Sequence, residues 1–216
     1  MKIYVVRHGE TAWNKEEVFR GRKDVPLNDR GVGQAERTGR FFAGKRISLI
    51  CSSPLSRARQ TASEIGKSCN VAVKVDDAFI DMDFGRWEGL SLPAVRKAFP
   101  ESFETWRNNP HRFCIEGSET LTRVRSRSMK GLRQAISTVP KDDPSEPVII
   151  IVTHRVICKL LALHFLGVSN RFFWKVKCDP ASITLAEQAG GEMVLSMLNQ
   201  TLHLQEPSDN MEYRDF

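Results

Sequence analysis

Runs of apolar and β-branched residues recur along the chain and predict the strands of a sheet. The runs at 2–6 and 148–152 are mostly apolar, as expected for strands that are buried on both faces. Near the C-terminus, two further runs flank Gly190-Gly191, which predicts a hairpin. The predicted strands are 2–6, 47–51, 71–75, 148–152, about 182–187 and about 193–199.

Amphipathic segments between these strands predict helices, and several carry residues typical of helix ends. Asn28 is a candidate N-cap and Gly44 a candidate C-cap, while Ser53 followed by Pro54 predicts another helix start. A polar loop with prolines covers 140–147. The predicted helices are 28–44, 53–69, about 92–99, about 101–108, 117 to about 136, and 156–166.

The alternation of strands and helices predicts an α/β fold. We expect a three-layer α/β/α sandwich whose sheet is mainly parallel, with an antiparallel edge formed by the C-terminal hairpin. A length of 216 residues suits a single domain, 1–216. Residues 80–117 lack a strong strand pattern and hold two short predicted helices, so we expect them to form a small helical insertion over the functional site.

The composition narrows the function classes. Lys and Arg number 32 against 26 acidic residues, and this net charge of +6 favours anionic partners. The basic residues are scattered rather than grouped in runs, which favours a small anion over a nucleic acid. No apolar stretch approaches the ~20 residues of a membrane-spanning helix. The N-terminal run is interrupted too early for a secretory signal. Five cysteines without a Cys-x-x-Cys pair indicate reduced thiols in a cytoplasmic protein.

Basic side chains follow three of the predicted strands. Arg7 and His8 come directly after strand 2–6, His154 follows strand 148–152, and Arg57 lies just beyond strand 47–51. Because ligand sites in open α/β sheets gather beyond the carboxyl ends of the strands, we expect these side chains to meet. Helix N-termini at the same edge favour a phosphate group. The carboxylates at 76–83 lack metal-ligand spacing, so the sequence predicts neither a metal nor another cofactor.

The stretch Val6–Asn14 (VRHGETAWN) resembles the signature of the histidine phosphatase superfamily, which has a phosphoglycerate mutase-like fold. Further blocks that resemble this family follow in order, and the ordered set is highly specific. They are Gly21–Gly31, Ser52–Ala62, Phe84–Gly89, Gly117–Thr120 and Val152–His154. Three later segments look most like metal-independent phosphoserine phosphatases and related small-metabolite phosphatases, including α-ribazole phosphatases. These segments are Trp106–His111, Phe172–Trp174 and Cys178–Ser182.

The resemblance implies a metal-independent phosphatase that hydrolyses a small phosphomonoester. His8 would attack phosphorus and become a phosphohistidine, Arg7 and Arg57 would clamp the phosphoryl oxygens, and His154 would donate a further hydrogen bond. Other residues implied in the pocket are Asn14, Thr11 and Gly21, and a loop-capping role is the alternative for Asn14.

Two departures from the family pattern concern the substrate side of the site. The usual proton donor is a glutamate, and the alignment places Asp81 there; Glu88 is the rival, although its block suggests a structural role. Arg155 stands where relatives often have a small residue. If Arg155 faces the pocket, it favours a carboxylated or doubly phosphorylated metabolite. Alternatively, it caps a neighbouring loop.

Two other functions fit the same family. One is a cofactor-dependent phosphoglycerate mutase, which the compact 80–117 region disfavours. The other is a catalytically silent regulatory protein, which the intact basic set disfavours. The expected partner is therefore a small phosphorylated metabolite, with no nucleic acid and no membrane. The aromatic segment Phe172–Trp174 suits either the core or a contact in a homodimer.

Overall fold

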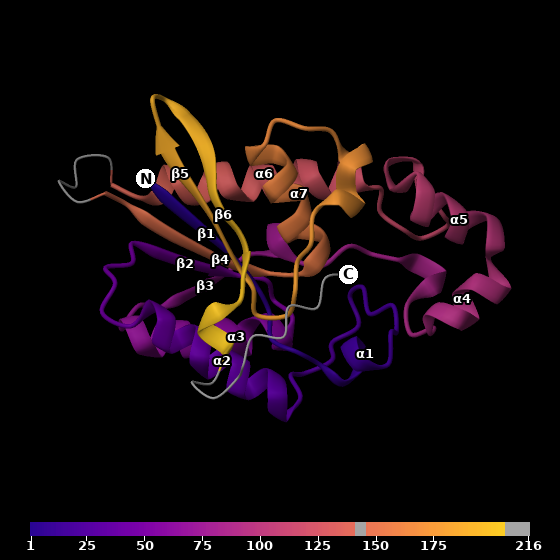
Figure 1. Cartoon of the computed structure of the whole chain (residues 1–216), viewed down its shortest axis with the longest axis horizontal. Coiled ribbons are helices and arrows are strands. Elements are labelled where there is room, and N and C mark those ends of the chain that lie inside the picture. The colour runs from indigo at the N-terminus through magenta and orange to yellow at the C-terminus, as the bar shows by residue number, and fades with distance from the viewer. Residues whose placement is uncertain (141–145, 206–216) are drawn as a thin grey trace.

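A computed structural model describes residues 1–140 and 146–205. Within these residues, six strands form one mixed sheet in the order β3-β2-β4-β1-β5-β6, and the pairs among β1 to β4 are parallel. The last two strands are antiparallel and add the edge (Figure 1). The strands are β1 (Lys2–Arg7), β2 (Leu49–Ser52), β3 (Val73–Val75), β4 (Val148–Thr153), β5 (Ile183–Ala189) and β6 (Glu192–Gln200).

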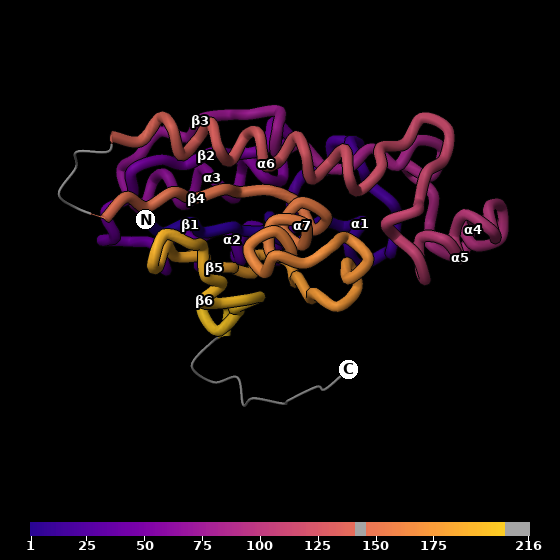
Figure 2. Tube along the Cα trace, turned by 90° about the horizontal axis from the view of Figure 1, so that it is seen from above, coloured from indigo at the N-terminus to yellow at the C-terminus, as the bar shows by residue number. Residues whose placement is uncertain are grey.

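Helices cover both faces of this sheet, which confirms the predicted α/β sandwich. Figure 1 shows α6 and α7 on one face and α2 and α3 on the other, and in Figures 1 and 2 α4 and α5 project beyond one end. The helices are α1 (Ala12–Lys15), α2 (Asp29–Phe42), α3 (Ser56–Cys69), α4 (Leu92–Ala98), α5 (Pro100–Asn108), α6 (Leu121–Thr138) and α7 (Arg155–Phe165).

Alternation along the central strands divides the core into two apolar layers. Ile3 and Val5 of β1 point toward α6 and α7, whereas Tyr4 and Val6 pack with residues of α2 and α3. The strands β1 and β4 pair residue for residue from Lys2 with Val148 to Arg7 with Thr153. This register brings the two polar segments that follow them to the same edge of the sheet.

Two predicted helix starts are wrong. The helix expected from Ser53 begins at Ser56 with Leu55 as its N-cap. The Ser53 hydroxyl accepts from the Leu55 N–H at 3.3 Å, before the helix, and lies 2.7 Å from Nε2 of His154. The helix expected from Gly117 begins at Leu121 with Thr120 as its N-cap. There the Glu119 carboxylate accepts hydrogen bonds from Arg127 and is held outside the helix. In both places a long-range contact overrides the local signal.

Other boundaries differ from expectation by a few residues. The strand expected at 47–51 covers Leu49–Ser52, and that expected at 71–75 covers only Val73–Val75. The central residues 141–145 of the predicted polar loop lie outside the described residues. All five cysteines are described and have free thiols. None of the described helices is long and apolar enough to cross a bilayer.

Candidate active site

The four basic side chains singled out from the sequence lie together where the parallel strands have their carboxyl ends. We call these four residues the basic cluster. Arg7 ends β1 and His8 follows it, His154 caps α7 after β4, and Arg57 lies in the first turn of α3. All four are at most 4 % exposed. The His8 and His154 ring centroids are 5.1 Å apart, and Arg57 Nε lies 3.3 Å from His154 Nδ1.

His8 is held as a neutral imidazole with one free nitrogen. Its Nδ1 lies 2.6 Å from the Gly9 carbonyl oxygen, which can only accept, so Nδ1 carries the proton. Its Nε2 is buried without a hydrogen-bond partner. Burial and then the charges of Arg57 and Arg7 hold the pKa of His8 well below 6.5. The ring therefore presents an unprotonated Nε2 lone pair at neutral pH.

His154 has the opposite proton placement. Arg57 Nε donates to Nδ1 of His154, so its proton is on Nε2, which donates to the Ser53 hydroxyl at 2.7 Å. Burial and the charge of Arg57 also keep the pKa of His154 well below 6.5. Ser53 thus orients the ring so that Nδ1 faces Arg57 and Asp81.

Backbone carbonyl groups hold the two arginines in place. Arg57 donates to the carbonyl oxygens of Gly21 at 2.9 Å and Lys23 at 2.8 Å, which ties the loop after α1 to the site. Arg7 donates through Nη1 to the Cys178 carbonyl at 2.6 Å, and its buried Nε has no partner. Fixed guanidinium groups of this kind are suited to binding phosphoryl oxygens.

The two candidate acids have different surroundings. Asp81 is 6 % exposed, and its Oδ2 lies 3.5 Å from Arg57 Nη2 and 3.7 Å from His154 Nδ1. Glu88 instead accepts hydrogen bonds from the backbone N–H groups of Arg22 and Phe84. Burial raises the pKa of Glu88, and these two hydrogen bonds oppose that effect. Asp81 therefore contacts the basic cluster, whereas Glu88 joins two loops.

The remaining predicted site residues divide into two groups. Gly21 and Arg155 line a cavity of about 130 Å³ together with Asp81. Thr11 and Asn14 do not line it. The Asn14 side-chain oxygen accepts hydrogen bonds from the backbone N–H and hydroxyl of Thr11, which are the contacts of a loop cap. The Thr11 hydroxyl in turn lies 3.3 Å from Arg20 Nη1.

The cavity lies in front of the basic cluster rather than inside it. None of His8, Arg7, Arg57 and His154 lines it. Asp81 forms part of its wall and touches Arg57 and His154 on the other side. The Asp81 carboxylate therefore contacts the donors that a phosphoryl group would use.

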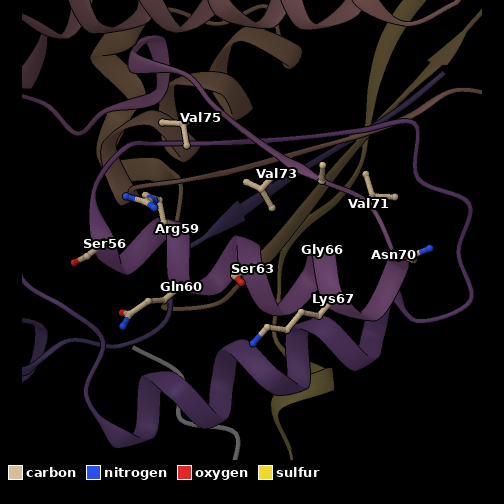
Figure 3. A pocket seen from close by; sticks show the side chains of 11 residues that line it. Ser56, Arg59, Gln60, Ser63, Gly66, Lys67, Asn70, Val71, Val73 and Val75 are labelled. Atoms are coloured by element: carbon tan, nitrogen blue, oxygen red, sulfur yellow. The ribbon is translucent and has the colours of Figure 1, made fainter.

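A larger hollow of about 680 Å³ lies elsewhere, between α3 and β3 (Figure 3). Its walls include Arg59, Ser63 and Val73. None of the basic cluster lines it, and neither does Asp81. Since it contains no buried titratable cluster, its size alone does not make it the site of chemistry.

Sequence reasoning missed Arg20 and Ser53. Arg20 lines the 130 Å³ cavity, and its buried Nε has no partner. Its place directly before Gly21, in a loop already expected at the pocket, is the signal that could have found it. No signal in the sequence separates the contact of Ser53 with His154 from a helix cap. Within the described residues, no group of three or more His, Cys, Asp or Glu side chains could hold a metal.

Comparisons with known proteins agree with this geometry. The model of the "Histidine phosphatase superfamily (branch 1)" matches residues 3–201. Phosphoserine phosphatase 1 of Hydrogenobacter thermophilus is 32% identical over 206 residues, which cover 95% of each chain. Among solved structures, Bacillus stearothermophilus YhfR has a TM-score of 0.86 at 25% identity and covers 94% of this chain and 99% of its own. The α-ribazole phosphatase of Shigella flexneri has a TM-score of 0.81 at 22% identity, covers 93% and 96%, and shows the same fold. With its family model matched over most of its length, this chain belongs to branch 1 of the histidine phosphatase superfamily and is a histidine phosphatase.

Proposed function

We propose that the protein hydrolyses small phosphomonoesters without a metal, in two steps through a phosphohistidine on His8. The observation that carries the proposal is the buried His8 ring. Its Nδ1–H group donates a hydrogen bond to the Gly9 carbonyl oxygen, and its Nε2 has no hydrogen-bond partner. A neutral imidazole with an unengaged nitrogen in a cationic site is the form that can attack an electron-poor phosphorus.

In the first step, His8 Nε2 forms a bond to phosphorus while the bond from phosphorus to the ester oxygen breaks. Arg7, Arg57 and His154 stabilise the charge on the phosphoryl oxygens. For this, the phosphoryl group replaces the Asp81 carboxylate at Arg57 Nη2 and His154 Nδ1. The dianion offsets the positive field of the arginines, so that Nδ1 of His154 takes a second proton from solvent, gives up the hydrogen bond that it accepts from Arg57 Nε, and donates to a phosphoryl oxygen.

Asp81 supplies the proton that the leaving oxygen needs. Of the two candidate acids it contacts the basic cluster, and it also lines the cavity. In the second step, water attacks the phosphohistidine, gives one proton back to Asp81 and breaks the bond between phosphorus and Nε2. Inorganic phosphate then leaves. Loss of the acid is expected to lower turnover by about 10²–10⁴-fold.

The test is phosphate release from a panel of small phosphomonoesters, with and without a chelator, for the wild type and for His8→Ala and Asp81→Asn. We expect turnover that survives the chelator, acid-labile phosphate on His8 in quenched samples, and no turnover in His8→Ala. Asp81→Asn should lose most activity with poor leaving groups and least with p-nitrophenyl phosphate. Isomerisation of 3-phosphoglycerate without phosphate release, or a requirement for metal, would contradict the proposal.

A further inference from the structure

Four guanidinium groups, those of Arg7, Arg20, Arg57 and Arg155, surround the site, and within the described part of the chain only Arg57 has a carboxylate partner. Arg57 pairs with Asp81 at 3.5 Å. Among the described residues, no carboxylate lies within 4.0 Å of Arg7, Arg20 or Arg155. A phosphomonoester contributes two negative charges, and Asp81 contributes none while it carries the proton for the leaving oxygen, so two of the four positive charges stay unbalanced when the substrate binds. Since unpaired charges are costly away from water, the site favours a further anion.

Arg155 is the group best placed to bind that anion. It lines the 130 Å³ cavity beside Asp81 and also an outer cavity of about 520 Å³ with Phe19, Trp106 and Trp174. Its guanidinium lies 5.9 Å from the Trp174 ring centroid. None of the described residues accepts a hydrogen bond from it, so it caps none of the described loops. Burial, reinforced by Arg7, lowers the pKa of Arg155 to about 10.

Arg20 faces the same cavity from the opposite loop. Its Nη1 donates to the Thr11 hydroxyl at 3.3 Å, which fixes the side chain, and its Nε is buried without a partner. Burial and then the charge of Arg7 lower the pKa of Arg20 to about 9. The charged residues that line the cavity are therefore Arg20 and Arg155, neither paired with a carboxylate of the described residues, the exposed Glu17, and Asp81, which we assign as proton donor.

We propose that Arg155 and Arg20 bind a second anionic group of the substrate, a carboxylate or a second phosphate, close to the phosphate ester. The inference rests on the proposed function, because Asp81 marks the position of the ester oxygen. The preferred substrates are then phosphomonoesters with a negative charge a few bonds from that oxygen. The phosphate ester of an uncharged alcohol leaves Arg155 and Arg20 without an anionic partner, and it is therefore bound less well.

The test compares kcat/KM for two substrates that differ in one group: 3-phosphoglycerate, which has a carboxylate, and glycerol 3-phosphate, which has a hydroxymethyl group there. A second comparison, of fructose 1,6-bisphosphate with fructose 6-phosphate, tests whether the second anionic group is a phosphate. The variants are Arg155→Gln, Arg155→Lys and Arg20→Gln. Arg59→Gln, on the exposed side of α3, is the matched control.

We expect the wild type to prefer the doubly anionic member of at least one pair by roughly ten- to hundredfold. Arg155→Gln and Arg20→Gln should reduce this preference at least tenfold, Arg155→Lys should retain part of it, and Arg59→Gln should retain all of it. The pair that shows the effect identifies the second anion as a carboxylate or a phosphate. Equal kcat/KM values within both pairs, or a preference that survives in Arg155→Gln, would overturn the inference while leaving hydrolysis intact. If no substrate, p-nitrophenyl phosphate included, gives phosphate or a phosphohistidine, the proposed function itself fails.

Discussion

At Ser53, one hydroxyl group fixes the proton distribution on His154. It accepts the Nε2 proton at 2.7 Å, and this leaves Nδ1 free to face Arg57 and Asp81. Without that acceptor, the buried Nε2 N–H group of His154 has no partner, either in the neutral ring or in the doubly protonated ring that donates through Nδ1. Ser53 is therefore a positioning residue that acts through His154.

Ser53→Ala should lower kcat by about ten- to hundredfold, because a lost hydrogen bond that leaves a buried group unpaired costs about 1–3 kcal/mol. KM should change much less, since Arg7 and Arg57 keep their contacts. The measurement is kcat and KM between pH 5 and 9, in which a changed pH profile distinguishes a lost proton position from general damage. Ser63→Ala, on an exposed part of α3, is the matched control. Unchanged kcat in Ser53→Ala would remove Ser53 from the mechanism.

Residue positions were predictable where a strand leads directly into the site. Arg7, His8 and His154 follow β1 and β4, whose parallel register decides where their side chains meet. Arg20 was not predictable in this way, because its direction depends on the irregular loop that Arg57 holds through the Gly21 and Lys23 carbonyls. At Gly21, φ is +50°, and a Cβ would meet the Glu88 carboxylate. Such contacts join distant parts of the chain, and no local pattern encodes them.

At the scale of elements, the packing of α6 against the 3-10 turn Asp77–Phe79 supports the segment that carries Asp81. Gly131 of α6 faces this turn so closely that a Cβ there would lie 2.5 Å from the Ala78 Cβ and 3.2 Å from the Phe79 ring. Arg127 of α6 donates to the carbonyl oxygens of Ala78, Ile80 and Asp81. The helix therefore positions Asp81 through its backbone.

Gly131→Ala should destabilise the protein by about 1–3 kcal/mol, since overpacking outweighs the gain in helix propensity. The same change in α2, Gly33→Ala, should stabilise it by about 0.5–1 kcal/mol, because there the nearest atom to the new Cβ is an Arg37 side-chain nitrogen at 3.6 Å. Urea unfolding of both variants measures the difference. Equal changes in the free energy of unfolding in the two variants would show that α6 can move away from the turn without loss of stability.

Helix existence was more predictable than helix starts. The periodic apolar positions predicted α2, α3, α6 and α7. Asn28 caps α2 as expected, since its side chain accepts from the Gly31 N–H at 2.8 Å. The starts of α3 and α6 were wrong because Ser53 and Glu119 bind distant partners, His154 and Arg127. The four-residue helix α1 is too short for a periodic pattern to predict.

For the whole molecule, the buried histidines make stability depend on pH. Burial holds the pKa of His8 and His154 well below 6.5, and it lowers the pKa of His203 to about 4. His203 lies against α2, with Nε2 3.2 Å from the Thr38 hydroxyl. In the unfolded chain these rings are exposed and titrate near the ordinary value of 6.5. Below that pH, the unfolded state therefore binds more protons than the folded state.

The direction in which stability changes with pH follows from this difference in proton binding. Above pH 6.5 the histidines are neutral in both states and contribute no pH dependence, whereas between pH 6.5 and the folded pKa values stability falls as the pH falls. Each histidine contributes a slope of up to about 1.4 kcal/mol per pH unit. Urea unfolding at a series of pH values measures the total slope. His203 lies outside the cluster of Arg7, His8, Arg57 and His154. His203→Gln should reduce the slope of the unfolding free energy between about pH 6.5 and 4 by up to the contribution of one titrating histidine. A slope that is the same with and without His203 would mean that its ring is hydrated in the folded state, and that burial does not govern its titration.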